Sequence, residues 1–247
     1  MANPQPRPAV RWTLLAACLL VGLACYRLGV WQVDRLGQRR AQNALIVERT
    51  ARPPIELSSA LALADPAFQP VIVRGRFDSA FALYLADRAR DEVPGAQVVA
   101  PVRSDESDIT ILVNLGWVGI ERAEASPPSA WLPQGTVELH GVLRASQEEP
   151  RLAWLADPTP APGAPPRARW RVLYIAGIQA QTPYALAPYF VALTEPATPE
   201  SAILPTPEID LSDGPHLSYA IQWFAFGTTA IVGGIAWARS ARRKSVN

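Results

Sequence analysis

The chain has 247 residues, and its 23 Lys and Arg side chains nearly balance its 22 Asp and Glu side chains, for a formal net charge of +1. Because sequence-independent nucleic-acid binding needs an excess of basic charge, we expect no nucleic-acid partner. Charged residues make up 18% of the chain and hydrophobic residues 49%. This composition is too apolar for a disordered protein and poor in charge for a wholly soluble one. A membrane segment is therefore the first feature to look for.

The two cysteines lie close together near the N-terminus, and the rest of the chain carries no thiol. Cys18 and Cys25 share one apolar run, and Met1 is the only methionine. This pattern excludes a disulfide scaffold, a zinc site of the CxxC type, a CxxCH haem attachment and a methionine-rich copper site.

The first apolar run covers residues 12–33 and contains a single charge, Arg27. At about 1.5 Å of rise per residue, a helix of this length crosses the hydrocarbon layer. Arg27 lies close enough to its end for the guanidinium to reach the interface. A cleaved signal sequence is the alternative, because Arg7 and Arg11 precede an apolar stretch with small residues. The length of the run favours a retained transmembrane helix.

A second apolar run, residues 219–238, has no charge at all. The flanking charges are Glu208, Asp210 and Asp213 before it and Arg239, Arg242, Arg243 and Lys244 after it. Because basic segments stay on the cytoplasmic side, we expect residues 1–11 to be a cytoplasmic N-terminus and residues 239–247 a basic cytoplasmic tail, or both to face the matrix in an organelle. Residues 34–218 are then an extracytoplasmic domain.

The central region is long enough for one domain with its own core. Residues 36–49 contain no helix breaker, so the first helix is expected to continue out of the membrane until Pro53 and Pro54 stop it. Short helices are expected at residues 56–64 and 175–181. Period-two alternation predicts strands at residues 71–77, 80–86, 97–102, 109–118, 137–144, 169–175 and 189–194.

The remaining central segments are expected to be irregular. Residues 87–95 and 121–133 are predicted connections, 158–166 an exposed proline-rich loop, and 195–207 the tether that returns to the membrane. The predicted fold class is therefore a membrane α+β protein, in which an N-terminal and a C-terminal transmembrane helix flank one mostly antiparallel β domain with minor helices.

The central region offers little visible catalytic machinery. His140 shares a predicted strand face with Glu138 and Arg144, which is typical of a solvated sheet surface. The acidic pairs Asp105/Glu106 and Glu148/Glu149 stand beside loop residues without a supporting base. We find no serine elbow, glycine-rich phosphate loop or HExxH motif. Hydrolase and nucleotide chemistry therefore have no visible machinery in this sequence.

His216 is the candidate ligand of the chain. Residues 212–215 read as a helix start, with polar capping residues followed by proline, so His216 is expected in the first turn of the second span, at the outer interface. The positive end of the helix dipole disfavours an imidazolium there, and a neutral imidazole is what a metal or haem iron requires. A triad of His216 with two nearby aspartates is disfavoured, because Gly214 and Pro215 interrupt the helical spacing.

Aromatic and amide side chains surround this position in the prediction. At helical spacing, Tyr219 and Trp223 share a face with His216, and Trp31 and Gln32 lie at the outer end of the first span. These five residues are the candidate cofactor-binding set, with His216 as the metal ligand. The alternative is an interfacial aromatic belt beside a histidine that bonds a carbonyl or water.

Small residues predict contact between the two spans. The stripes are Cys18, Gly22, Cys25 and Gly29 on the first span, and Ala230, Gly234 and Ala238 on the second. Such spacing permits close helix packing, so the cysteines are expected to be packing groups.

Five blocks of sequence, in this order, resemble the surfeit locus protein 1 family of cytochrome oxidase assembly factors. They are Leu28-Gly29-Val30-Trp31-Gln32 with Arg35 and Arg39; Gly75-Arg76-Phe77-Asp78; Pro94-Gly95 with Pro101; Val113-Asn114-Leu115-Gly116-Trp117-Val118; and His216-Leu217-Ser218-Tyr219-Ala220-Ile221-Gln222-Trp223-Phe224. The resemblance covers nearly the whole chain. Two departures are Leu115, where the family commonly has arginine, and Asp213-Gly214, where an asparagine is common.

The resemblance implies a non-enzymatic assembly factor that helps to mature a haem-copper terminal oxidase. Its expected partners are the catalytic subunit of that oxidase, the lipid bilayer and the enzyme that makes haem A. Its expected cofactor is haem a, held transiently, with the histidine that matches His216 as a proposed ligand. A cofactor-free scaffold that stabilises an oxidase assembly intermediate is the alternative, and an anchored extracytoplasmic enzyme is a third reading.

The expected location is a bacterial inner membrane, with both termini cytoplasmic and the central domain periplasmic. The short N-terminus lacks an Arg- and Ser-rich amphipathic leader, which favours this location over the mitochondrial inner membrane.

Overall fold

The computed structural model describes residues 8–150, 156–158, 160, 164–205 and 209–243. The chain divides into two compact units, one made of residues 1–45 and 210–247 and the other of residues 46–209.

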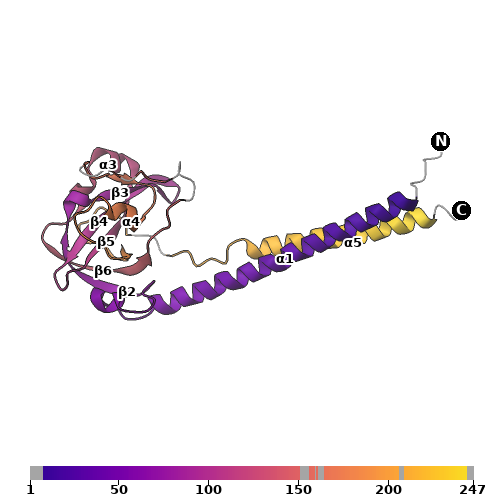
Figure 1. Cartoon of the computed structure of the whole chain (residues 1–247), viewed down its shortest axis with the longest axis horizontal. Helices are drawn as coiled ribbons and strands as arrows, with labels where there is room; N and C mark the ends of the chain where they lie inside the picture. Colours follow the sequence, from indigo (N-terminus) through magenta and orange to yellow (C-terminus); the bar gives the residue numbers. More distant parts are fainter. Residues whose placement is uncertain (1–7, 151–155, 159, 161–163, 206–208, 244–247) are drawn as a thin grey trace. The chain divides into compact units, whose positions relative to one another are not determined.

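The first unit is a pair of long helices, α1 (Pro8–Thr50) and α5 (His216–Arg243), shown in indigo to purple and in yellow in Figure 1. Both are long and apolar enough to cross a membrane. The predicted continuation of the first helix beyond the apolar run is confirmed. The helix ends at Thr50, shortly before Pro53 and Pro54, as proline chemistry requires.

The two helices run antiparallel, with glycines at their contact. A Cβ added to Gly22 would lie 2.5 Å from Cγ1 of Ile231, and one added to Gly29 would lie 2.5 Å from Cε1 of Phe224. Contacts made by later residues of α1 therefore fall on earlier residues of α5. The predicted stripe on α1 is confirmed, because Cys25 is buried as well. Small side chains let the two backbones approach.

On α5 the predicted stripe is confirmed in part. A Cβ on Gly234 would lie 2.7 Å from Cβ of Cys18, whereas Ala230 and Ala238 are only half-buried. Gly227, which the prediction omits, is buried, and its Cβ would meet the ring of Tyr26 at 2.7 Å. The Tyr26 hydroxyl also lies 2.8 Å from the Thr228 hydroxyl.

The second unit is an eight-stranded mixed sheet with small helices. In chain order its strands are β1 (Ile55–Glu56), β2 (Pro70–Phe77), β3 (Leu83–Arg90), β4 (Val93–Ser104), β5 (Thr110–Gly119), β6 (Thr136–Ala145), β7 (Arg169–Trp170) and β8 (Tyr189–Leu193). The helices are α2 (Leu57–Leu61), α3 (Ile120–Ala125) and α4 (Ile175–Gln179), with single 3₁₀ turns at Ser79–Phe81 and Pro128–Trp131. Most neighbouring strands are antiparallel, and the parallel pairs are β1–β2, β3–β7 and β5–β8. The predicted fold class is confirmed.

The sheet closes into a ring because β4 changes its neighbour along its length. Its first part pairs with β3, and its last residues pair with the end of β2, so the ring runs β2-β6-β8-β5-β4 and returns to β2. Pro101 stands between the two pairings and contributes only its carbonyl, which accepts from the Asp78 N–H at 2.9 Å. Proline suits a strand position with no donor to pair. At the closure, a Cβ on Gly75 would collide with the Arg103 carbonyl.

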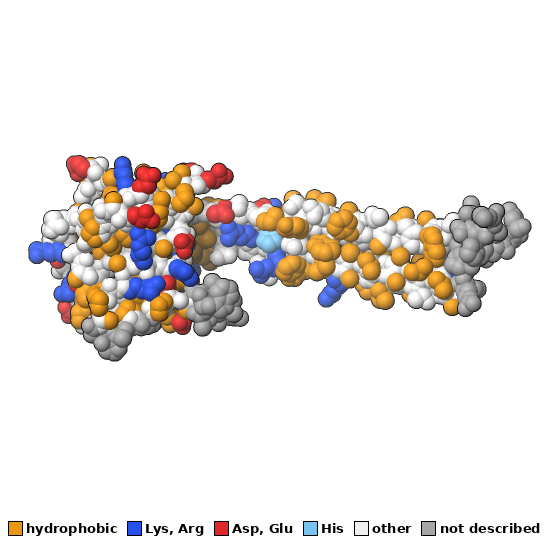
Figure 2. All heavy atoms as spheres, turned by 90° about the horizontal axis from the view of Figure 1, so that it is seen from above, with side chains coloured by type: hydrophobic (Ala, Val, Ile, Leu, Met, Phe, Trp, Pro, Cys, Tyr) orange, Lys and Arg blue, Asp and Glu red, His pale blue; other side chains and the backbone are white. Residues whose placement is uncertain are grey.

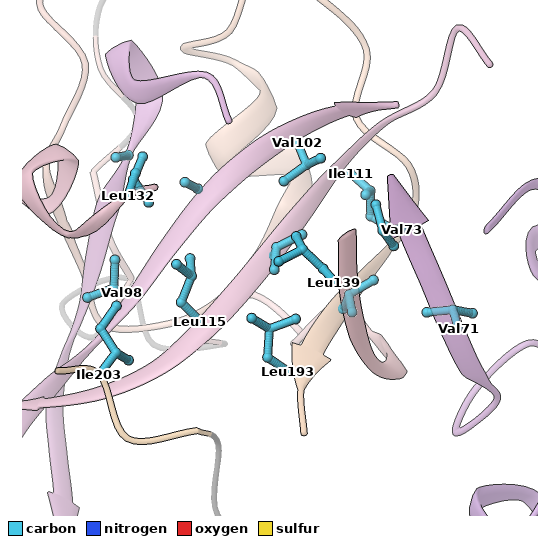
Figure 3. Close-up of a cluster of buried hydrophobic side chains, with 14 of the residues drawn as sticks. Val71, Val73, Val98, Val102, Ile111, Leu115, Leu132, Leu139, Leu193 and Ile203 are labelled. Atoms are coloured by element: carbon cyan, nitrogen blue, oxygen red, sulfur yellow. The ribbon is translucent and has the colours of Figure 1, made fainter. Parts of the chain in front are cut away.

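The ring encloses the main hydrophobic core. Alternate residues of the five ring strands point inward, and Figure 3 shows Val71, Val73, Val98, Val102, Ile111, Leu115, Leu132, Leu139, Leu193 and Ile203 facing one another. The outer face of β4, β5 and β8 is covered by a second cluster that includes Trp170, Leu173 and Ile178. Leu115 is 1% exposed and belongs to the main core.

Most predicted strands and both short helices are observed near their expected places, but four predictions in the second unit are wrong. Residues 79–81 form a 3₁₀ turn instead of strand, and residues 87–95 are not a connection, since β3 and β4 form a hairpin there. The strand expected at 169–175 is two residues long. The predicted connection at 121–133 contains most of α3 and a 3₁₀ turn.

The segment at residues 195–207 is not a free tether in its described part. Ile203 is buried in the main core, and Leu204 and Trp117 exchange backbone hydrogen bonds of 2.7 and 3.0 Å. Residues 206–208 and part of the predicted loop 158–166 lie outside the described residues.

Candidate functional site

The segment that precedes α5 is held by side chains of α1. Arg39 donates to the carbonyls of Asp210 (2.7 Å) and Ser212 (3.0 Å), and Asn43 donates to the carbonyl of Leu211 (2.6 Å). These carbonyl groups belong to an irregular segment and so have no partner within a helix or sheet; the side chains of α1 supply their hydrogen bonds. We call residues 210–213 the strap. The strap sets where the chain enters α5, and His216 is the first residue of that helix.

Ion pairs reinforce the strap. Arg40 donates through Nε (3.0 Å) and Nη2 (2.7 Å) to Oδ2 of Asp213, which holds the pKa of that carboxyl below its usual range. The backbone N–H of Ser212 donates to Asp210, and this bond lowers the pKa of the Asp210 carboxyl. The predicted helix cap is corrected here, because the Asp213 carboxylate binds Arg40 and not the first turn of α5. Both aspartates are held as carboxylates on exposed side chains.

His216 and Gln32, two residues of the predicted set, are in direct contact. Nδ1 of His216 lies 2.8 Å from Oε1 of Gln32, and Gln32 is only 9% exposed. An amide oxygen can only accept, so Nδ1 is the donor and carries the proton. The lone pair of a neutral ring is then on Nε2, which lies on the side of Gly214: a Cβ added to that glycine would be 3.8 Å away. This is the tautomer that leaves Nε2 free to ligate.

The three aromatic residues of the predicted set lie differently. Trp31 is 53% exposed and Tyr219 46% exposed, on the outer surface of the helix pair. Trp223 is half-buried, and its ring meets the edge of Phe226 at a centroid distance of 6.2 Å. Trp31 and Tyr219 therefore lie on the outside of the pair, where lipid or a partner can contact them, whereas Trp223 is only partly accessible.

A polar cavity of about 350 Å³ opens beside His216. Its lining residues are Arg35, Gln38, Arg39, Gln42, Asp210, Ser212, Asp213, Gly214 and His216. Figure 2 shows basic side chains gathered on this part of the helix pair, next to a long surface of hydrophobic side chains. This polar lining was not predicted from the sequence. A periodic signal was available, because Arg35, Arg39 and Gln42 follow Gln32 at spacings of three and four.

The other titratable candidates form a surface cluster around Arg74. Its guanidinium pairs with Glu56 (2.9 Å), Glu106 (3.0 Å) and Glu138 (2.7 Å), and it lowers the pKa of the Glu106 and Glu138 carboxyls. His140 lies 3.3 Å from Glu138. The predicted shared strand face of His140 and Glu138 is confirmed. The cluster is an ion-pair network that ties β1, β2 and β6 together.

Two of the sequence blocks that resemble the family, those containing Asp78 and Asn114, have structural roles in the second unit. Asp78 caps the 3₁₀ turn through the Ala80 N–H (3.2 Å) and pairs with Arg103 (2.9 Å). Asn114 accepts from the Gly116 N–H at 3.0 Å, and Gly116 has φ +123°, a conformation that favours glycine. These residues shape the turns of the second unit.

The donor set around His216 fits a single axial ligand better than a multidentate ion site. Within the described ranges, no group of three or more His, Cys, Asp or Glu side chains is arranged to hold a metal ion. A lone neutral imidazole with an oriented second nitrogen is the kind of ligand that a haem iron accepts, since the porphyrin fills the other positions. His216 and Gln32 therefore fit such a group.

The chain was also compared with known proteins. The model of the SURF1 family matches residues 19–228. Surfeit locus protein 1 of Xenopus tropicalis is 31% identical over 165 residues, which cover 59% of this chain and 52% of that protein. The mouse protein of the same name is 29% identical over 161 residues, covering 59% of this chain and 51% of its own length. The chain thus spans about half the length of these curated relatives. An uncharacterized SURF1-like protein of Mycobacterium bovis is 28% identical over 214 residues, covering 83% of this chain and 74% of that protein.

Proposed function

Because the chain belongs to the SURF1 family, we propose that it is a membrane-anchored, non-enzymatic assembly factor for a haem-copper terminal oxidase, and that His216 binds the iron of haem a while the catalytic subunit matures. The observation that carries the proposal is the 2.8 Å bond between His216 Nδ1 and Gln32 Oε1. It leaves Nε2 as the free nitrogen at the edge of a cavity.

Each residue near His216 has a defined part in this proposal. His216 would supply the nitrogen that holds the haem iron, and Gln32 fixes the tautomer and the orientation of its ring. Trp31, Tyr219 and Trp223 offer flat apolar surface on the outside of the helix pair to the macrocycle or to the oxidase subunit. A bound haem supplies an iron centre that accepts the imidazole lone pair. The strap keeps the first turn of α5 in place, so that the imidazole is presented before any partner arrives.

The proposed location follows from charge and length. Residues 12–33 and 219–238 would cross a bacterial inner membrane, with residues 1–11 and 239–247 in the cytoplasm and residues 34–218 in the periplasm. The basic tail after the second span favours this orientation. His216 then lies at the outer interface, where it can receive haem a from the membrane enzyme that makes it and pass it to the oxidase subunit.

A cofactor-free scaffold is the second candidate, and the exposure of the aromatic residues favours it. Trp31 and Tyr219 present large side chains outward. Exposed aromatic surface beside apolar helices is suited to gripping another membrane protein.

Absorption spectra of the full-length protein separate the two candidates. The protein is purified from cells that synthesise haem A, as the native chain and as His216→Ala and His140→Ala variants. We expect a haem a spectrum from the native chain that is lost in His216→Ala. His140→Ala is the matched control, because it removes the only other histidine, on an exposed strand face, and should keep the spectrum. A native chain without haem that still supports oxidase maturation would instead establish the scaffold.

A further inference from the structure

We infer that Arg35 and the polar cavity beside His216 form a binding site for a carboxylate of the porphyrin, so that the protein holds haem by its iron and by its acidic edge. This inference rests on the proposed function, because it assigns a second contact to the same ligand.

The charge balance around the cavity identifies Arg35. In the described part of the helix pair, Arg39 is paired with Asp210 (3.6 Å) and Arg40 with Asp213 (2.7 Å). Arg35 takes part in no ion pair there. Its Nη1 donates to Gln38 Oε1 at 2.8 Å, and the other N–H groups of its guanidinium remain available to a ligand. Of the two arginines that line the cavity, Arg35 is therefore the one that no carboxylate of the described residues pairs with.

The geometry places that charge beside the proposed iron ligand. Arg35 comes three residues after Gln32 on α1, which is one helical turn. Gln32 holds His216, and Arg35 and His216 line the same cavity. A ligand held at His216 would thus have Arg35 on the wall of the same cavity.

The chemistry of the site favours a carboxylate. A guanidinium binds a carboxylate through two parallel hydrogen bonds, and this geometry gives both strength and orientation. The first turn of α5 adds to the attraction: Tyr219 N–H is bonded to Pro215 O, and the N–H groups before it lie at the positive end of a 28-residue helix. Haem carries two propionate carboxylates on one edge, whereas the rest of its periphery is apolar or neutral.

The test compares an acidic porphyrin with its neutral ester. Full-length protein in nanodiscs of zwitterionic lipid is titrated with ferric protoporphyrin IX and with its dimethyl ester, and the Soret band and tryptophan quenching report binding. We expect Arg35→Gln to weaken binding of the acid by about tenfold, the loss expected for one charge-assisted contact, and to leave binding of the ester unchanged. Arg35→Lys should recover part of the affinity, because it restores the charge without the fork.

Arg27→Gln is the matched control, since Arg27 lies two turns earlier on the exposed face of α1, outside the cavity. It should leave both affinities unchanged. Equal effects of Arg35→Gln on acid and ester, or no effect on either, would overturn the inference while leaving the axial ligand intact. Loss of the ligated Soret band for both porphyrins in His216→Ala tests the proposed function separately. If the native chain binds neither porphyrin, both proposals fail.

A second set of titrations tests whether the cavity binds an anionic lipid headgroup instead of a porphyrin. The titrations are repeated in nanodiscs that contain phosphatidylglycerol. If Arg35→Gln changes only the dependence on anionic lipid, and acid and ester bind alike, then the cavity holds a lipid headgroup and the porphyrin assignment is wrong.

Discussion

The tautomer of one imidazole depends on one amide. Gln32 is buried at the contact of the two helices, and its oxygen faces Nδ1 of His216. Removing this acceptor leaves the ring proton free to occupy either nitrogen, because no fixed partner then selects between them.

We therefore expect Gln32→Leu to convert a single His216 tautomer, protonated at Nδ1, into a mixture. Nitrogen-15 NMR of the ring in a His140→Ala background measures the two forms directly, since only one histidine remains. Gln38→Leu is the control: Gln38 lines the same cavity but bonds Arg35, so the tautomer should persist. A native ring protonated at Nε2 would contradict the prediction.

At this scale the sequence predicted where His216 and Gln32 lie on the two helices, but not that they are in contact. His216 and Gln32 were identified from a helix start and from a span end, and their hydrogen bond required the register of two helices far apart in the chain. The bonds that Arg39 and Asn43 make to the strap could not be predicted, because they go to carbonyl groups of an irregular segment. Side chain to carbonyl bonds leave no periodic pattern in the sequence.

The helix pair shows how one methyl group can decide packing. Gly233 and Gly234 are adjacent on α5, but only Gly234 faces α1. A Cβ there would lie 2.7 Å from Cβ of Cys18, whereas a Cβ on Gly233 has no atom of the described chain within 4 Å.

Gly234→Ala should therefore separate the helices and destabilise their association by about 1–3 kcal/mol, the usual cost of overpacking. Gly233→Ala should be neutral or slightly stabilising, because alanine is the better helix former. Reversible unfolding in mixed detergent micelles, followed by circular dichroism, measures both. Equal stability of the two variants would show that the helices do not meet at this face.

Secondary structure was easier to predict than the turns that join it. The hairpin between β3 and β4 turns at Asp91 and Glu92, which both have positive φ, 49° and 66°. Such turns usually contain glycine or asparagine, so two acidic residues looked like part of a solvated connection. The strand expected at 169–175 fails for another reason. Its apolar residues belong to the second cluster, but most of them lie on irregular backbone. Burial alone does not distinguish a strand from a buried irregular segment.

At the scale of the whole molecule, the closed ring depends on the close approach of the β2 and β4 backbones at Gly75. Gly75 lies where β2 meets the end of β4, and its missing side chain leaves room for the Arg103 carbonyl. This closure was not predictable from local patterns, since β2 and β4 pair across a turn and a further strand.

Gly75→Ala should force the two strands apart and lower the free energy of unfolding of the β unit by at least about 1–3 kcal/mol. Gly119→Ala, whose Cβ would have its nearest neighbour at an ordinary 3.7 Å, should change it little. Thermal melts of the full chain, monitored by the β-sheet signal, make the comparison. A Gly75→Ala melt that matches the native protein would mean that the ring is not closed at this point.

The pairing of strands also limits how another protein can join this one. The outermost strands, β1 and β7, have two residues each, and the longer open border of β3 is interrupted at Asp87, whose φ is +56°. Short or kinked borders that carry charges such as Arg88 and Arg90 offer a poor template for backbone pairing. A protein partner would therefore have to recognise the β unit through its side chains, and such docking carries little risk that the sheets of two copies pair with each other.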